Sequence, residues 1–566
     1  MINKKILFSL GFMGTFSLMP LGVISCVWHQ NDDHLNITKE SYKFYNLSSH
    51  HKIYSKSANL YFKENENIPY VSISEMINML DGFLESSYIS KLTSSFFNQK
   101  TYYWDNYKFT VNWKTNKMFV NNLGFFRFTK SSSTTDYSKH LKYISYNVHK
   151  TKDFKKTIEF NLEKYGLDIL NYRDKLLIPL PVFNTLFCSQ NYYNLYFNGE
   201  NLYGAYFDLD DRTPNINKIK SGGFENKLQS LVDRKNTLGH LLWTLDHFYG
   251  LKDHKGISKF SDYLSDEDKN KILSTNPNSN NEAYAKLFYN KLNDLHTWMS
   301  MLSFYNDANT KVSSLNTMSS NSEQYRKILS KLIDLRKRRF YYGNVPPVRF
   351  VGNTAIISFD EFKTGTKNEL AEPDAYKYDT YELMKYAMKE IKEYSMRNTP
   401  IKNIVVDLSL NGGGNVAAMY RALGFLTKKP IEDYDYNTLS KTISERKFRV
   451  DTDGNGRYNN LDGYPEYKWN VLVGKNTFSA ANLFTAIAKY TNLARIIGQQ
   501  SGGGECSVMP NVMADGTSYV ISSNNASRIL NGNDHYQSIE SGIDPHKWMS
   551  YDDFYDDNKI WELVNN

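Results

Sequence analysis

Residues 470–484 constrain the fold of this 566-residue chain more than any other stretch. They begin with an apolar, β-branched run that stops at Gly474, continue through a short polar turn and reach Ser479. Apolar residues then recur at the spacing of one helix face, which predicts a strand, a turn and an α-helix. Ser479 thus stands at a helix N-terminus, where free N–H groups and the helix dipole stabilise negative charge. Its hydroxyl is either a nucleophile beside an oxyanion site or only the cap of the helix.

A glycine-rich turn follows another apolar run earlier in the chain. Residues 403–410 have the pattern of a buried strand, and Gly412, Gly413 and Gly414 come directly after Asn411. These glycines either form a plain turn that needs positive φ or also turn backbone amides toward a site. The sequence leaves both interpretations open.

Four segments together resemble, in order and spacing, the S41 family of tail-specific or C-terminal processing serine peptidases. They are the strand and glycine turn of 403–415, the helix start at Ser479, the strand and glycine loop of 494–504, and the segment 539–545. The resemblance covers roughly residues 345–550. It implies an α/β fold with a crotonase- or ClpP-like peptidase core, and it implies that Ser479 is the nucleophile.

The general base differs from that of one large branch of the family. That branch uses a lysine in the glycine loop, where this chain has Gly504, which has no side chain to act as a base. A second branch pairs serine with an upstream histidine and a downstream glutamate. His296, in an Asp-Leu-His-Thr segment, resembles the signature of that histidine, and Glu540 matches the glutamate.

The resemblance therefore implies a triad of Ser479, His296 and Glu540. A serine hydroxyl needs a base, and histidine accepts and returns a proton near neutrality. The glutamate would orient the imidazole and stabilise the imidazolium. The amide of Ala480 and one from Gly412 or Gly413 are the candidates for the oxyanion hole.

Each triad member has a simpler interpretation. His296 lies in a helix-like stretch, 284–302, and is otherwise a half-buried structural histidine, while Glu540 is otherwise a solvated loop charge. We expect His240 and His247 to be structural residues. His535 and His546 flank Glu540 and are alternative candidates for the base.

We expect neither a metal site nor a cofactor. No paired His/Cys spacing indicates zinc, and no glycine motif indicates phosphate binding. Whether Cys188 and Cys506 pair is left open. The net charge of +8 is mild and scattered, and no nucleic-acid-binding module is recognised.

The N-terminus predicts export. Lys4 and Lys5 precede the largely apolar stretch 6–24, and Val-Ile-Ser then leads to Cys26. A basic start, an apolar core and small residues mark a secretory signal. The ending resembles a bacterial lipobox, which implies lipidation of Cys26 and attachment to the outer face of the cell membrane. The alternative is an uncleaved membrane helix.

The remaining segments suggest the domain order. We expect a signal peptide at 1–26, a polar tether at 27–45, a strand-rich module at 46–210, a mainly helical segment carrying His296 at 211–345 with a polar break at 276–281, and the peptidase core at 346–566. Residues 67–76 and 175–183 form a weak repeat of Ile-Pro followed by a short helix. About 50 residues separate His296 from the next strand, which leaves little room for the PDZ domain of many S41 enzymes.

Two functions fit these observations. The first is a surface-anchored serine endopeptidase that hydrolyses polypeptides. The second is a catalytically inactive S41-like lipoprotein that acts as a binding or adhesion module. The oligomeric state does not follow from the sequence.

Overall fold

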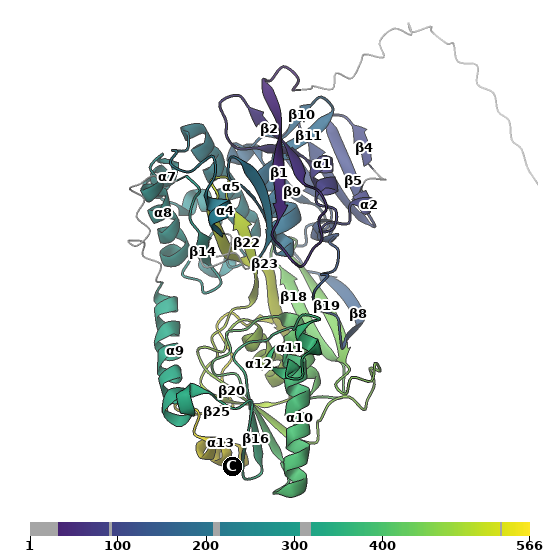
Figure 1. Cartoon of the computed structure of the whole chain (residues 1–566), viewed down its shortest axis with the longest axis vertical. Helices are drawn as coiled ribbons and strands as arrows, with labels where there is room; N and C mark the ends of the chain where they lie inside the picture. Colours follow the sequence, from purple (N-terminus) through teal and green to yellow (C-terminus); the bar gives the residue numbers. More distant parts are fainter. Residues whose placement is uncertain (1–31, 90–92, 208–215, 306–318, 533–534) are drawn as a thin grey trace, which may run out of the picture.

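The computed structural model describes residues 32–89, 93–207, 216–305, 319–532 and 535–566. Cys26 and the predicted signal region therefore lie outside the described residues. The described part is elongated, with the N-terminal strands and the helices before residue 305 in the upper half of Figure 1. The lower half holds the sheet and helices of the C-terminal part. Within the described ranges, no helix has the length and apolar character that a membrane span requires.

Two sheets build the N-terminal part, as the aromatic, strand-like sequence predicts. The larger has the strand order β10 (Leu170–Tyr172), β11 (Lys175–Pro179), β3 (Tyr70–Ser72), β2 (Ser57–Lys63), β1 (Ile37–Asn46), β13 (Asn201–Tyr206), β12 (Tyr193–Phe197). The smaller has the order β4 (Thr93–Phe96), β5 (Gln99–Trp104), β6 (Tyr107–Asn112), β7 (Lys117–Val120), β9 (Ile158–Asn161). Three short helices accompany them: α1 (Ile73–Met79), α2 (Ser86–Ile89) and α3 (Leu180–Phe183).

The predicted internal repeat is confirmed as two strand-then-helix units. In the first, β3 leads into α1, and in the second, β11 leads into α3. The two strands pair with each other antiparallel, with Pro179 opposite Tyr70. The repeated units are thus neighbours in one sheet.

The segment before residue 305 is mainly helical, but its end differs from the prediction. It contains α4 (Ile216–Lys220), α5 (Leu231–Phe248), α6 (Phe260–Tyr263), α7 (Asp266–Leu273) and α8 (Pro277–Ala285). The predicted break at 276–281 is wrong, because Asn276 caps α8 and Pro277 occupies its first turn. The helical interpretation of 284–302 is also wrong beyond residue 291. The backbone turns at Asn293, with φ of 43°, and strand β14 (Trp298–Met301) follows.

The C-terminal sheet explains the near-continuous apolar runs of the sequence. Its order is β15 (Val348–Val351), β16 (Thr354–Ser358), β17 (Asn403–Asp407), β20 (Lys468–Val473), β21 (Arg495–Gly498), β25 (Lys547–Trp548), and all but β15 run parallel. Alternate residues face opposite sides: Val406 and Val471 join one apolar cluster, while Val405 and Leu472 join the other. Helices α10 (Thr380–Arg397), α11 (Val416–Gly424) and α12 (Ala480–Tyr490) cover the first side. Helices α9 (Ser320–Arg339) and α13 (Asp557–Asn565) cover the second. A parallel sheet buried on both faces requires such runs.

A fourth sheet joins the two halves of the molecule. Its main order is β14, β23 (Ser518–Leu530), β18 (Ile431–Asn437), β19 (Thr442–Val450), β8 (Leu141–Lys150), and both β22 (Cys506–Val512) and β24 (Tyr536–Ser538) also pair with β23. Strand β8 comes from the N-terminal part and pairs with β19 along its whole length. Strands β22 and β23 reach upward in Figure 1 and share an apolar cluster with residues from the N-terminal part.

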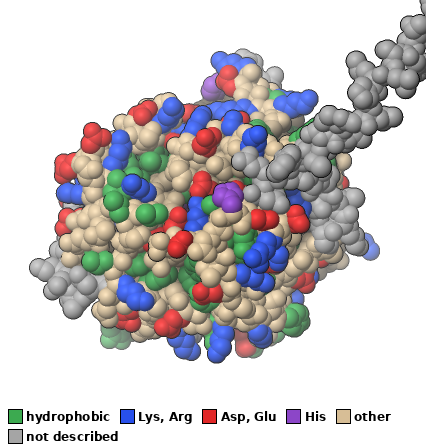
Figure 2. Space-filling view, turned by 90° about the horizontal axis from the view of Figure 1, so that it is seen from above, with side chains coloured by type: hydrophobic (Ala, Val, Ile, Leu, Met, Phe, Trp, Pro, Cys, Tyr) green, Lys and Arg blue, Asp and Glu red, His purple; other side chains and the backbone are tan. Residues whose placement is uncertain are grey.

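The upper face of the molecule has no dominant charge. Figure 2 shows Lys and Arg side chains interspersed with Asp and Glu over the described part of this face. This mixture agrees with the scattered charges of the sequence.

Candidate active site

Ser479 lies at the carboxyl edge of the parallel sheet, between β20 and α12. Its backbone has φ of 57° and ψ of −122°, in a region that residues other than glycine rarely adopt. The Ser479 side chain makes no capping hydrogen bond with the helix. The hydroxyl is thus left available at the N-terminus of α12, and the interpretation of Ser479 as only a helix cap does not describe this geometry.

The glycine turn lies directly against Ser479. A Cβ atom built on Gly413 would stand 2.8 Å from the Ser479 Cβ and 3.1 Å from the Ala480 nitrogen. Gly413 also has φ of 111°, which favours glycine. Its amide donates to the Asn411 side chain at 2.9 Å. By contrast, the amides of Gly412 and Ala480, both described residues, donate to no partner in the protein.

His296 lies in a turn before β14 and is 5% exposed. Asp294 forms the turn, because its carboxylate accepts from the His296 amide at 3.0 Å and from the Thr297 hydroxyl at 2.7 Å. The imidazole packs on Phe478, with 4.5 Å between ring centres, and its buried Nδ1 has no hydrogen-bond partner in the described protein. Burial lowers the pKa of His296, although the charge of Asp294 acts in the opposite direction. At neutral pH the ring is therefore an uncharged base.

Glu540 is partly buried and is not a solvated loop charge. One of its carboxylate oxygens accepts from the Glu505 amide at 2.9 Å. Burial and then the negative charge of Asp294 raise the pKa of Glu540 to about 7. A carboxyl group with this pKa changes charge in the range where serine peptidases work.

Gly503 and Gly504 hold the three candidate residues around one turn. The Ser479 amide donates to the Gly503 carbonyl at 2.9 Å, and the Gly504 amide donates to the Glu540 carbonyl at 3.4 Å. A Cβ built on Gly504 would stand 3.1 Å from the His296 Cε1. No hydrogen bond joins the side chains of Ser479, His296 and Glu540, all of which are described. The structure gathers the three residues around the turn without linking them.

An ionic network that the sequence reasoning missed supports this turn. Glu505 follows Gly504, and its carboxylate accepts from His254 at 3.0 Å and pairs with Arg528. Burial opposes the ionisation of Glu505, yet the hydrogen bonds from His254 and Arg528 bring its pKa to about 2. Glu505 is therefore a permanent anion beside Glu540. The only sequence signal was its position next to the glycine loop.

The remaining histidines and cysteines have other roles. His240 is fully buried against the Thr185 hydroxyl at 2.9 Å, as expected for a structural residue. The Nδ1 of His546 accepts from the Ile496 amide at 2.8 Å. Cys188 and Cys506 are both free and buried, and burial raises the pKa of each thiol. Neither cysteine is suited to act as a nucleophile at neutral pH.

A cavity of about 860 Å³ lies where the N-terminal part meets the fourth sheet. Ser479, His296 and Glu540 do not line it. Its wall includes Val416, at the start of α11 just after the glycine turn, and Ser507 of β22. Asparagine, serine and aromatic side chains make up most of the remaining wall, so the cavity offers hydrogen bonds and apolar contacts together.

The glycine turn, Ser479 and Glu540 fall within one recognised domain. Residues 353–547 match the model of "Peptidase family S41". The chain carries a peptidase domain of family S41. The match spans β16 to β25, and His296 lies outside it.

The solved structures similar to this chain are distant. The photosystem II D1 C-terminal processing protease is 16% identical over 37% of this chain and 49% of its own, with a TM-score of 0.27. A putative peptidase from Parabacteroides merdae is 16% identical over 59% of this chain and 97% of its own, with a TM-score of 0.36. Mature CPAF is 12% identical over 59% of this chain and 97% of its own, with a TM-score of 0.37. No protein of curated function matches the sequence.

Proposed function

We propose that this protein is a surface-anchored serine endopeptidase that uses Ser479, His296 and Glu540 to hydrolyse polypeptides. The observation that carries the proposal is the backbone of Ser479, which leaves its hydroxyl uncapped at a helix N-terminus. The S41 domain supports a peptidase, and the buried, uncharged imidazole of His296 beside Phe478 supports the choice of base.

The proposed mechanism follows from these groups. His296 accepts the proton of the Ser479 hydroxyl as the oxygen attacks the substrate carbonyl. The free amides of Ala480 and Gly412 stabilise the oxyanion that forms, a contribution of about 3 kcal/mol for each donor in comparable sites. His296 then donates the proton to the leaving amine, and water releases the acyl group by the same steps in reverse order.

Formation of the triad requires the side chains of Ser479, His296 and Glu540 to approach one another. Ser479 and His296 are not hydrogen-bonded in this structure, and catalytic hydrogen bonds often become short only when substrate is bound. The unpartnered Nδ1 of His296 is the atom that Glu540 would accept from. The cavity, with its polar and aromatic wall, is our proposed position for part of an extended polypeptide.

The surface location rests on the sequence pattern that ends at Cys26. We propose that Cys26 is lipidated and that the protein is held at the outer face of the membrane by that lipid. Detergent-phase partitioning of the protein, compared with a Cys26→Ala variant, tests this part of the proposal separately from catalysis.

Two observations favour a second candidate function, that of a catalytically inactive binding module. Gly504 stands where one S41 branch has its lysine, and no hydrogen bond joins Ser479 to His296. An inactive S41-like lipoprotein, acting as a binding or adhesion module, would have the same features.

Fluorophosphonate labelling of the purified full-length protein distinguishes the two functions. We expect labelling of the wild type and hydrolysis of a denatured protein substrate, with both lost in Ser479→Ala and in His296→Ala. The matched control is His535→Ala, which removes an exposed histidine that was an alternative base. A folded wild type without labelling or hydrolysis would support the binding module, and loss of activity in His535→Ala would contradict the choice of His296.

A further inference from the structure

The connection between β19 and β20 contains a regularly spaced set of oxygen-bearing residues. Asp451, Asp453 and Asn455 occupy positions one, three and five of a twelve-residue loop, and Asp462 occupies position twelve. Calcium loops of the EF-hand type place ligands at these positions and require glycine at position six. Here position six is Gly456, with φ of 78°. The loop departs from that pattern by having aspartate rather than glutamate at position twelve.

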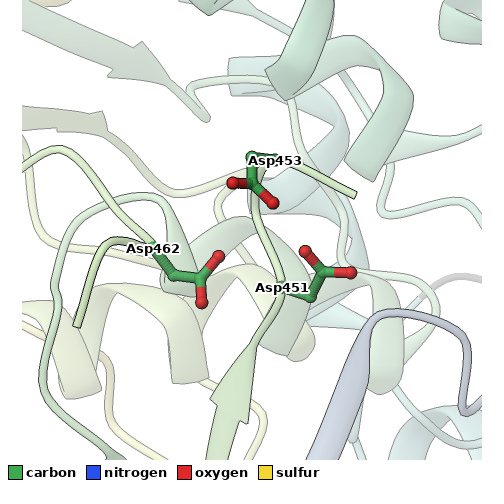
Figure 3. Close-up of side chains that lie close together, drawn as sticks. All are labelled: Asp451, Asp453 and Asp462. Carbon is green, nitrogen blue, oxygen red and sulfur yellow. The ribbon is translucent and has the colours of Figure 1, made fainter. Parts of the chain in front are cut away.

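The fold brings the three carboxylates of this loop together. One oxygen from each of Asp451, Asp453 and Asp462 lies within 4.8 Å of the others. Figure 3 shows the three side chains directed toward a common space. Asp451 is 1% exposed and Asp462 is 4% exposed, so two of these carboxylates are removed from water.

No lysine or arginine in the described part of the chain balances these buried charges. Among the described lysines and arginines, none forms an ion pair with the three aspartates, and Lys385, which lies beside Gly454, pairs with Glu382. Of the described histidines, His140 contacts Asp451, at 3.3 Å. Buried carboxylates without a counter-charge are costly.

Backbone amides fix the orientation of the Asp451 carboxylate. Gly456 donates to one of its oxygens at 2.9 Å and Gly454 to the other at 2.8 Å. Asp451 thus lies buried and ordered next to two further carboxylates. A bound divalent cation would remove the repulsion among the three.

We propose that this loop binds a calcium ion. The carboxylates of Asp451, Asp453 and Asp462 and the side-chain oxygen of Asn455 would be its ligands, with the backbone carbonyl of Arg457 at position seven. A site built entirely from protein oxygen atoms suits calcium, which accepts flexible coordination. Magnesium demands a small, regular octahedron and usually keeps several of its waters.

The ion would stabilise the junction of several elements. The Tyr381 hydroxyl of α10 donates to the Asp451 carbonyl at 2.8 Å, and His140 connects the same aspartate to the start of β8. After the loop, the Tyr464 amide donates to the Phe425 carbonyl at 2.9 Å, close to the end of α11. Calcium would therefore stabilise the S41 domain without entering the reaction.

Thermal unfolding of the full-length protein in calcium, magnesium and EGTA tests the proposal. At about 10 mM calcium we expect the Tm to rise by about 5 °C over EGTA, with a smaller rise in magnesium. Titration calorimetry should give one site, with a Kd of about 10⁻⁴–10⁻³ M, as in extracellular calcium modules. Terbium provides a second readout, because Tyr458 lies within the loop and can sensitise its emission.

Asp453→Ala is the informative variant, because it removes the ligand oxygen at position three, and Asp453 is exposed and accepts hydrogen bonds from Asn455. We expect it to fold normally, to lose the calcium-dependent rise in Tm and to weaken calcium binding at least about tenfold. The control is Asp266→Asn, which removes a carboxylate with 95% side-chain exposure from α7 and should change neither result. A wild type without a calcium-dependent Tm shift or saturable binding would overturn the proposal, leaving a turn closed by its own hydrogen bonds. Calcium binding of unchanged affinity in Asp453→Ala would also overturn it.

Discussion

Ser479 is held in a strained conformation by its neighbours. A residue other than glycine at this φ costs about 1–3 kcal/mol. The Ser479 amide donates to Gly503 at 2.9 Å, and its carbonyl accepts from Leu483 at 3.0 Å, so both sides of the residue are fixed. The backbone is thereby forced to direct the hydroxyl away from the helix it precedes.

The close approach of Gly413 to Ser479 gives a prediction at the residue scale. In Gly413→Ala the new Cβ would stand 2.8 Å from the Ser479 Cβ and would require φ near 111°. We expect kcat/KM to fall about a hundredfold, because small displacements of a nucleophile have large effects. Gly256→Ala is the control: it has a positive φ of 63° and open space around it, so it introduces a milder backbone strain without the clash. Comparable losses in the two variants would contradict the explanation.

The raised pKa of Glu540 predicts the pH dependence of hydrolysis. In the proposed mechanism an ionised Glu540 stabilises the imidazolium of His296, so kcat/KM should rise with pH through an apparent pKa near 7. Asp294→Asn removes the charge that raises this pKa and should move the acid limb to lower pH. An unchanged acid limb in this variant would exclude Glu540 as the titrating group.

The raised pKa of Glu540 also makes the stability of the folded protein depend on pH. The pKa of Glu540 is higher in the folded protein than the ordinary value of 4.5. The contribution of Glu540 to stability is therefore complete below pH 4.5 and is lost as the pH rises through about 7. Protonated Glu540 therefore favours folding, whereas the proposed mechanism requires its ionised form.

At the scale of elements, α5 is fixed to the turn between β22 and β23 by a buried ion pair. Arg234 and Asp515 are 1% and 0% exposed in their side chains, and the charged groups lie 2.7 Å apart. The Tyr284 hydroxyl also accepts from Arg234 at 2.8 Å. This contact joins the helical segment to a hairpin of the C-terminal part.

Removal of one partner of this ion pair should strongly destabilise the folded protein. We expect Asp515→Ala to lower the free energy of unfolding by about 3–5 kcal/mol, because the arginine is left buried without its counter-charge. Denaturant titration followed by circular dichroism measures the change. The exposed pair of Lys269 and Asp266 is the reference, and Lys269→Ala should cost at most about 1 kcal/mol. A cost for Asp515→Ala as small as the reference would show that the pair does not fix α5.

The elements around Ser479 could be predicted because their sequences are strongly patterned. The apolar run before Gly474 became β20, and the helix period after Ser479 became α12. The end of the helical segment was mispredicted, because a single residue, Asn293, stops the helix with positive φ and apolar periodicity carries no sign of that turn. The search for His/Cys pairs likewise overlooked the oxygen spacing that begins at Asp451.

At the scale of the whole molecule, long-range pairing was the part that the sequence could not predict. Nothing in residues 141–150 indicates that β8 pairs with β19, some three hundred residues later. The pairing of β14 with β23 likewise joins the strand after His296 to the C-terminal part. These contacts place His296 next to the S41 domain. The order of the sequence motifs suggested this placement, but the strand pairing that produces it could be found only in the structure.

Because strands of the C-terminal part pack among residues of the N-terminal part, we predict that residues 346–566 do not fold alone. Met509 of β22 and Tyr519 and Ile521 of β23 belong to an apolar cluster built mainly by residues before 305, so the isolated fragment would expose them to water. We expect this fragment to aggregate or to lack cooperative unfolding, since exposed apolar surface of this size favours association. Co-expression with residues 32–345 should restore a soluble complex, because the missing side of the cluster and β8 are then present. A monomeric 346–566 fragment that unfolds cooperatively would mean that the S41 domain is independent and that His296 reaches it only by docking.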